Sequence, residues 1–357
     1  MFLENKKAHL AVITGCIFYS MNGLFIARIN DMAISPIIFY RLFFGLLFLF
    51  IYIAVRGKTS DLKLKKKKGS LLLQGVLVVT CMLLYFTCLK ITCVSIAILL
   101  QHTAPIYVLL ASPLILNEKV GKESIAALFV AITGVFLIVK PAEGFSGIEL
   151  TGPYIIGIIA GLLSGVVFAA LIMNVKVLKA EYPELAIMFW PMGIAFLILS
   201  PFAFDVSPDI FYGNMKILAI FGIVSIGLGE IFTIIGLANI EAQTGSLLAL
   251  VEPVSGVFFD RAVLGIALSY ETLAGCTLIM LSAAFISFKD SERIKKNQKA
   301  SFLRKFSGSS PGKFTVRSKH LLLSEALLYF QGGYGVQVRS QEPECQFRLQ
   351  DRQWLQS

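Results

Sequence analysis

Up to residue 288 the chain consists of long apolar runs separated by short polar segments. A helix needs about 20 apolar residues to cross roughly 30 Å of hydrocarbon. By that measure the sequence predicts ten membrane-spanning helices, at residues 8–28, 33–55, 70–90, 93–116, 122–140, 153–175, 185–204, 214–238, 243–265 and 269–288. The connections after residues 90 and 238 are only a few residues long, so the helices that they join should be antiparallel neighbours.

Composition narrows this picture to a membrane protein. Of 357 residues, 56% are hydrophobic and 15% are charged, whereas soluble globular chains are about 45–50% apolar and about 25% charged. We therefore expect an all-α integral membrane protein and exclude an aqueous domain before residue 289. The first span has full length and no small-residue cleavage site, so it should be an uncleaved anchor.

Basic residues in the short loops predict the orientation. With the N-terminus inside, the inner loops hold thirteen Lys and Arg residues and the outer loops hold five, as the positive-inside rule requires. Both termini are then cytoplasmic, in the cell membrane. The loop Lys63–Lys68 should lie against the anionic inner leaflet of the bilayer, worth about 1 kcal/mol per charge. Nothing in the sequence supports a nucleic-acid partner.

The six cysteines and three histidines do not have the spacing of a metal site. Five cysteines lie in or at the ends of apolar runs, with no CxxC pair near a histidine, and are expected to be small packing residues. We expect no metal. The loops also lack the clustered Asp or His residues that a membrane-embedded enzyme would use.

An internal repeat divides the chain. A shift of 148 residues lays Cys88–Leu116 on Gly236–Leu264 and places Pro105 on Pro253. Repeats of five spans, an odd number, must have opposite orientations in the membrane, an architecture common among secondary transporters with a midplane substrate site. We expect two inverted five-helix repeats, at residues 1–140 and 141–288, and a basic, mainly disordered cytoplasmic tail at 289–357.

Four residues carry a family resemblance. Pro105 and Pro253 lie in the middle of spans four and nine, Glu252 precedes the second proline, and Arg41 stands in span two within "FYRLFFG". With ten spans in two halves, this pattern resembles the EamA-type drug/metabolite transporters. The resemblance implies movement of small metabolites without ATP and without a bound cofactor.

The chain departs from the family pattern at one place. A Leu-Gly-Glu-like element normally follows both proline-containing spans of the family. "LNEKV" keeps the acidic residue as Glu118, whereas "LGIALS" has Ile266 instead. The resemblance covers about residues 8–288 and does not identify a substrate.

Ionisable side chains inside the spans are the main candidate site residues. Each costs about 2.5–3.5 kcal/mol on insertion scales and normally faces a cavity or a partner. Four of them lie roughly 12–14 Å from one surface at about 1.5 Å per residue: Arg41, His102, Glu230 and Glu252. They predict a polar layer near the midplane. Asp260 and Arg261 lie nearer the outer end and are expected at an interface.

Each of the four has a structural alternative. Arg41 either pairs with Glu230 or Glu252, which would let both be buried, or binds an anion through its forked guanidinium. Glu252 is either a neutral, hydrogen-bonded carboxyl at a helix break or a site for a cation or a proton. His102 either packs at a kink or lines the pathway. For Glu230 a structural role and a role in the pathway are likewise both left as alternatives.

Pro105 and Pro253 are candidate gating residues. A proline removes an amide donor and clashes with the carbonyl four residues back, so each is expected to kink its helix. Tyr85, Gln101 and Trp190 are weaker candidates to bind substrate. Their alternative role is hydrogen bonding between helices.

Within the tail, "SGSSPGKF" at residues 307–314 is unsuited to regular structure. "HLLLSEALLYF" at 320–330 is too short to span and could lie on the inner surface.

The combined expectation is a secondary transporter that works by alternating access, as a monomer or a homodimer. Its solute would be an amino acid, amine, nucleotide-like compound or organic acid, with proton coupling through the carboxylates as an option. Arg41 would meet an anionic part of the solute, Glu252 and Glu230 a cation or proton, and Trp190 and Tyr85 its apolar walls. The alternative is a non-transporting scaffold or sensor that acts through the basic tail.

Overall fold

The computed structural model describes residues 2–92, 94–139, 152–265, 269–307, 314–316, 335–341 and 344–350. The chain divides into two compact units, Met1–Arg293 and Ile294–Ser357. Up to Ser307 every regular element among the described residues is helical, as predicted.

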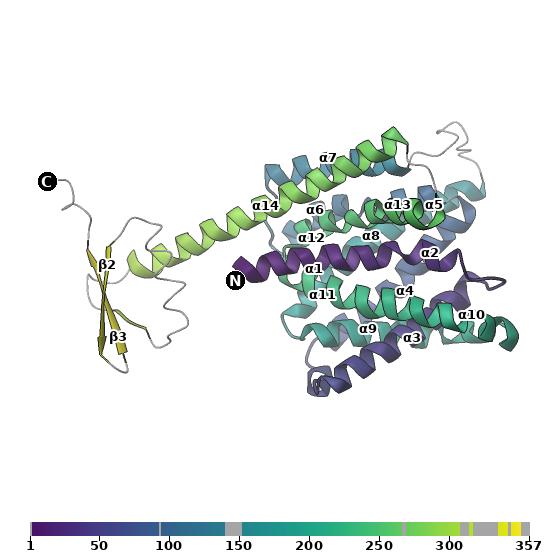
Figure 1. Ribbon diagram of the computed structural model, residues 1–357, viewed down its shortest axis with the longest axis horizontal. Coiled ribbons are helices and arrows are strands. Elements are labelled where there is room, and N and C mark those ends of the chain that lie inside the picture. Colours follow the sequence, from purple (N-terminus) through teal and green to yellow (C-terminus); the bar gives the residue numbers. More distant parts are fainter. Residues whose placement is uncertain are drawn as a thin grey trace. The chain divides into compact units, whose positions relative to one another are not determined.

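The first half of the helical unit contains α1 (Phe2–Ser20), α2 (Asn22–Ile26), α3 (Ile34–Val55), η1 (Thr59–Leu62), α4 (Lys68–Ile91), α5 (Val94–Gln101), α6 (Ala104–Ile115) and α7 (Lys122–Val139). The second half contains α8 (Pro153–Lys179), α9 (Glu184–Leu199), η3 (Ser200–Phe204), α10 (Pro208–Phe221), η4 (Gly222–Gly229), α11 (Glu230–Asn239), α12 (Ala242–Ala249), α13 (Val251–Leu264) and α14 (Tyr270–Ser307). Most of these helices lie side by side (Figure 1).

Eight stretches in the described residues are long and apolar enough to cross a membrane, rather than the ten predicted: Lys6–Ile26, Ile34–Val55, Lys68–Ile91, Ile96–Ile115, Pro153–Lys179, Glu184–Phe204, Pro208–Asn239 and Tyr270–Asp290. The other two predicted spans exist as helices. The span at 122–140 is α7, with 18 residues. The span at 243–265 is divided between α12 and α13 and contains Glu252, Asp260 and Arg261.

The surface of the helical unit supports a lipid environment. Large apolar side chains stand fully outward on several helices; Leu110, Leu114 and Phe129 are 70%, 85% and 70% exposed. Helices that are apolar on their outer as well as their inner faces are typical of proteins whose surroundings are hydrocarbon.

Helix packing follows the same pattern in both halves. Helix α4 of the first half packs against α8 and α9 of the second half. Correspondingly, η4 and α11 of the second half pack against α1 of the first half, and η4 also packs against α3. Likewise α5 and α6 contact α8, while α12 and α13 contact α1. Figure 1 shows α1 running alongside α11. Every one of these contacts therefore has a counterpart when the halves are exchanged.

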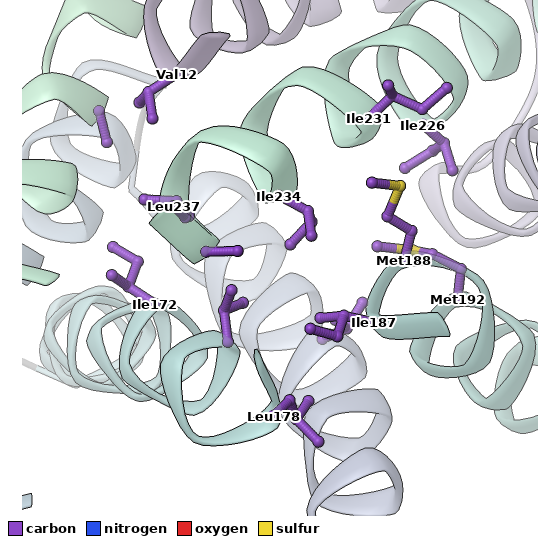
Figure 2. Close-up of a cluster of buried hydrophobic side chains, with 14 of the residues drawn as sticks. Val12, Ile172, Leu178, Ile187, Met188, Met192, Ile226, Ile231, Ile234 and Leu237 are labelled. Carbon is purple, nitrogen blue, oxygen red and sulfur yellow. The ribbon is translucent and has the colours of Figure 1, made fainter. Parts of the chain in front are cut away.

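The largest buried cluster joins both halves around their centre. Val12 from α1, Ile172 and Leu178 from α8, and Met188 from α9 are all nearly inaccessible. Figure 2 shows these side chains approaching those of η4 and α11, including Ile234.

The structure describes regular elements within residues 289–357, which we expected to be mainly disordered. Helix α14 continues to Ser307, and β1 (Phe314–Val316), β2 (Gly335–Gln341) and β3 (Glu344–Gln350) form an antiparallel sheet in the order β1-β3-β2. The predicted surface segment at 320–330 lies outside the described residues, and the disorder of the tail stays a prediction.

Candidate functional site

A cavity of about 700 Å³ lies inside the helical unit. Its walls come from α1–α5, α7, α8, α9, η4 and α11–α13, and hence from both halves. Seven of the nine predicted site residues line it: Arg41, Tyr85, Gln101, His102, Glu230, Glu252 and Pro253. The structure therefore brings together the four ionisable groups that the sequence placed at one depth.

Arg41 is buried on α3 and forms no salt bridge among the described residues. Its side chain is 7% exposed, its guanidinium carbon lies 5.0 Å from the centre of the Phe221 ring, and Nη2 lies 3.8 Å from Met82 Sδ. Its Nε has no hydrogen-bond partner in the described structure. A cation on an aromatic face with a free N–H can bind a further acceptor.

Two glycines allow α3 to carry Arg41 this close to the second half. A Cβ at Gly222 would lie 2.5 Å from the Arg41 backbone oxygen, and one at Gly45 would lie 2.4 Å from Ile226 Cβ. Gly222 begins η4, a π-helix that ends just before Glu230. Such segments are frequent at functional sites; this one was not predicted from the sequence.

Glu230 has a partner that the sequence analysis missed. The Tyr19 hydroxyl on α1 donates a hydrogen bond to Glu230 Oε2. Glu230 is 8% exposed, so this bond offsets part of the cost of burying a carboxylate. The sequence signal for this bond was a tyrosine inside the first apolar run. Because the chain has eleven tyrosines, that signal does not single out Tyr19 as the partner of Glu230.

Glu252, in the first turn of α13, is half-buried at the cavity wall. It lies within electrostatic range of Cys16, Arg41 and Tyr85, on three different helices. In the part of the chain that the structure describes, Glu252 has no hydrogen bond, and no salt bridge joins Arg41 to Glu252 or Glu230. The direct ion pair considered for Arg41 is therefore not formed.

His102 occupies the turn between α5 and α6. It is 4% exposed, and Nδ1 lies 2.9 Å from the Ile98 carbonyl oxygen. A carbonyl only accepts, so Nδ1 carries the proton and Nε2 is left as an acceptor. No described residue bonds to Nε2. Next to it, Gln101 Nε2 contacts Cys81 Sγ at 3.5 Å.

The prolines interrupt their helices instead of bending them. Helix α5 ends at Gln101 and α6 begins at Ala104, one residue before Pro105; α12 ends at Ala249 and α13 begins at Val251, two residues before Pro253. A proline is tolerated in the first turn of a helix, where its missing N–H has no partner anyway. The expected kinks are thus helix breaks, at equivalent places in the two halves.

Two predicted site residues are absent from the described lining of the cavity. Trp190 instead donates from Nε1 to the Leu62 carbonyl oxygen at 2.8 Å, which is the interhelical alternative that we considered. Pro105 is buried at the start of α6.

The residues that line the cavity differ in exposure between its two ends. We call the end that carries the Lys63–Lys68 loop the basic end. There the lining includes the buried side chains Gln74 and Val175, whereas at the opposite end it includes the exposed residues Gly23 and Ala27. No cluster of three or more His, Cys, Asp or Glu residues suited to a metal occurs among the described residues.

Apolar helices around a cavity with charges of both signs define a multi-pass membrane protein with a small-molecule site. The EamA-like transporter family model matches residues 6–140 and 155–288. The chain belongs to this family, as the sequence resemblance indicated.

Individual relatives agree with this assignment. The chain is 28% identical over 225 residues to the pseudopaline exporter CntI of Pseudomonas aeruginosa, covering 62% of this chain and 75% of the relative. It is 24% identical over 292 residues to an uncharacterized transporter of Archaeoglobus fulgidus, covering 80% and 97%. A solved crystal structure shares the fold with a TM-score of 0.70 at 18% identity, covering 81% of this chain and 99% of that one.

Proposed function

We propose that the protein is a secondary transporter that carries a small charged metabolite through the central cavity by alternating access. The observation that carries this proposal is a pair of ionisable groups of opposite sign, Arg41 and Glu252, which line one cavity in an apolar helical unit without a salt bridge to each other among the described residues. Buried charges without partners are costly unless a ligand or water completes them.

We assign a binding role to each cavity residue from the hydrogen bonds and salt bridges that it already makes. Arg41 meets an anionic group of the solute and Glu252 meets a cation or a proton, because neither has a described partner of opposite charge. Glu230 already accepts a hydrogen bond from Tyr19, so we expect it to contribute less than Glu252 to binding the solute. Tyr85, Gln101 and His102 complete the wall. Because Trp190 bonds to Leu62, we leave it out of this set.

The scaffold of this transporter is two inverted five-helix repeats, with ten membrane-crossing segments in all. Two observations support it: the family model matches once in each half, and helix contacts have counterparts when the halves are exchanged. Pro105 and Pro253, at the two helix breaks, are the proposed gating residues.

In the membrane, the basic end faces the cytoplasm and the anionic leaflet, because the loop Lys63–Lys68 and most loop Lys and Arg residues lie there. The termini are then cytoplasmic, and the unit works as a monomer or a homodimer. The name of the Pseudomonas relative favours export as the direction.

A first experiment identifies a solute and tests the two charges. Amino acids, amines, nucleotides and organic acids are screened by thermal shift, and a stabilising compound is assayed in proteoliposomes. We expect Arg41→Ala and Glu252→Gln each to reduce flux at least roughly tenfold, the effect of about 1.4 kcal/mol, with expression unchanged.

Glu123→Gln is the matched control for Glu252→Gln, because Glu123 is an exposed carboxylate on α7 outside the described lining of the cavity. It should keep wild-type flux. Full transport by both cavity variants would rule out the assigned binding site.

A further inference from the structure

Polar contacts join the two halves at the basic end. The Tyr182 hydroxyl accepts from Lys65 N at 2.9 Å and donates to Lys65 O at 3.1 Å. Lys67 Nζ donates to the Val177 carbonyl oxygen at 3.4 Å. These bonds tie the loop before α4 to the second half.

The strongest of these contacts holds the first turn of α12. Glu118, which follows α6 in the first half, accepts from Ala242 N at 2.8 Å through Oε1 and from Gln243 N at 3.4 Å through Oε2. A carboxylate at a helix N-terminus satisfies free N–H groups and interacts favourably with the helix dipole.

A second bond, deeper in the protein, supports the first. Gln243 Nε2 donates to Ser112 Oγ at 3.0 Å, and the two side chains are 1% and 0% exposed. Gln243 Oε1 has no partner among the described residues. That unsatisfied acceptor raises the free energy of the closed state, so the contact can be released.

Helix α12 runs from the Glu118 contact at the basic end to the cavity wall. All eight of its residues are buried, and only Ala249, its last, belongs to the cavity lining. The break at Leu250 separates it from α13, which carries Glu252. A short helix with a break at one end and a capping carboxylate at the other can move as a piece.

In the second repeat the position equivalent to Glu118 does not hold a carboxylate. Under the 148-residue shift the start of α12 corresponds to the start of α5, and Glu118 corresponds to Ile266. Ile266 lies outside the described residues, but an isoleucine side chain has no atom that could accept a hydrogen bond. The two ends of the pathway are therefore chemically unequal.

We propose that Glu118, Gln243 and Ser112 form a latch that keeps the basic end closed, and that releasing the first turn of α12 opens the cavity there. This inference rests on the proposed alternating access. It adds the prediction that the protein rests with its opposite end open, because the position equivalent to Glu118 at that end is Ile266, which cannot form the same contact.

Two native thiols in the cavity report the open side without any solute. Cys16 and Cys81 line the cavity and are free cysteines. A membrane-impermeant methanethiosulfonate is added to one face of sealed vesicles, trypsin cleavage at Lys63–Lys68 identifies that face, and mass spectrometry measures the modification rate of each thiol.

We expect the wild-type thiols to react from the face opposite the basic end. Glu118→Ala should raise their reaction rate from the basic end by roughly tenfold or more, since it removes two charge-assisted hydrogen bonds. Gln243→Ala should act in the same direction. Glu118→Gln keeps one acceptor oxygen and should give an intermediate rate.

The matched control is Glu123→Ala, which removes an exposed carboxylate five residues beyond Glu118 that forms no described hydrogen bond with α12; it should behave like the wild type. If neither Glu118→Ala nor Gln243→Ala increases modification from the basic end, the latch is wrong. A negative result here would not affect the test of Arg41 and Glu252. That test measures the flux of solute, whereas this one measures the access of a thiol reagent to the cavity.

Discussion

At the scale of single residues, the charged groups could be found from the sequence but their partners could not. Arg41, Glu230 and Glu252 stand out because each interrupts an apolar run, where ionisable groups are expensive. Which of them pair depends on the rotation of each helix about its axis. A hydropathy pattern that is apolar on all sides does not encode that rotation, so the Tyr19–Glu230 bond went unpredicted.

The Tyr19–Glu230 bond makes a prediction about stability. Tyr19→Phe leaves the Glu230 carboxylate buried without its donor and should lower stability by about 1–3 kcal/mol, measured as a lower thermal midpoint in detergent. Replacing both partners, in Tyr19→Phe with Glu230→Leu, should cost less than Tyr19→Phe alone. A double variant whose loss equals the sum of the two single losses would contradict a direct bond.

At the scale of elements, the positions of Pro105 and Pro253 predicted where the helices of spans four and nine depart from regular geometry. The prediction was a kink at each place. The structure has complete breaks at residues 102–103 and at Leu250. The π-helix of η4 lacked any signal that we recognised, because Gly222, Gly227 and Gly229 could equally serve close packing in a regular helix.

The crossing of α3 and η4 can be tested through Gly222. An alanine Cβ there would lie 2.5 Å from the Arg41 backbone oxygen, so α3 must shift. We expect a loss of about 1–3 kcal/mol of stability, seen as a lower thermal midpoint, and reduced flux because Arg41 moves.

Gly213→Ala is the control for this crossing. Gly213 lies on α10, in the same span, and a Cβ there would meet nothing within 4 Å. The substitution should be neutral or stabilising by up to about 1 kcal/mol, the difference in helix propensity. Equal losses at the two glycines would contradict the crossing of α3 and η4 as the cause of the loss at Gly222.

At the scale of the whole molecule, the membrane class and the division into related halves could be read from hydropathy and from the 148-residue shift. Of the ten predicted spans, eight occur among the described residues as stretches long and apolar enough to cross a membrane, and the other two are the helix α7 and the divided helix α12–α13. Packing between the halves follows from side-chain shape at each crossing, which the repeat alone does not specify.

The role of the C-terminal unit separates a transporter from the scaffold alternative. We expect deletion of residues 294–357 to leave flux near wild type, because the charged cavity lies in the unit Met1–Arg293. This boundary keeps Asp290, whose Oδ2 lies 3.2 Å from His9 Nε2. Flux is measured in proteoliposomes, and its loss with folding intact would favour a function through the tail.

The correspondence of helix contacts between the halves has an energetic consequence. In a protein built from two identical inverted repeats, the conformation open to one side would be related to the one open to the other by a two-fold rotation about an axis in the membrane plane. The two would then be isoenergetic, with an equilibrium constant of one. Any preference must come from positions where the halves differ, such as Glu118 against Ile266 and Glu252 against Ala104. A few substitutions at those positions would therefore change which side of the membrane the empty protein is open to.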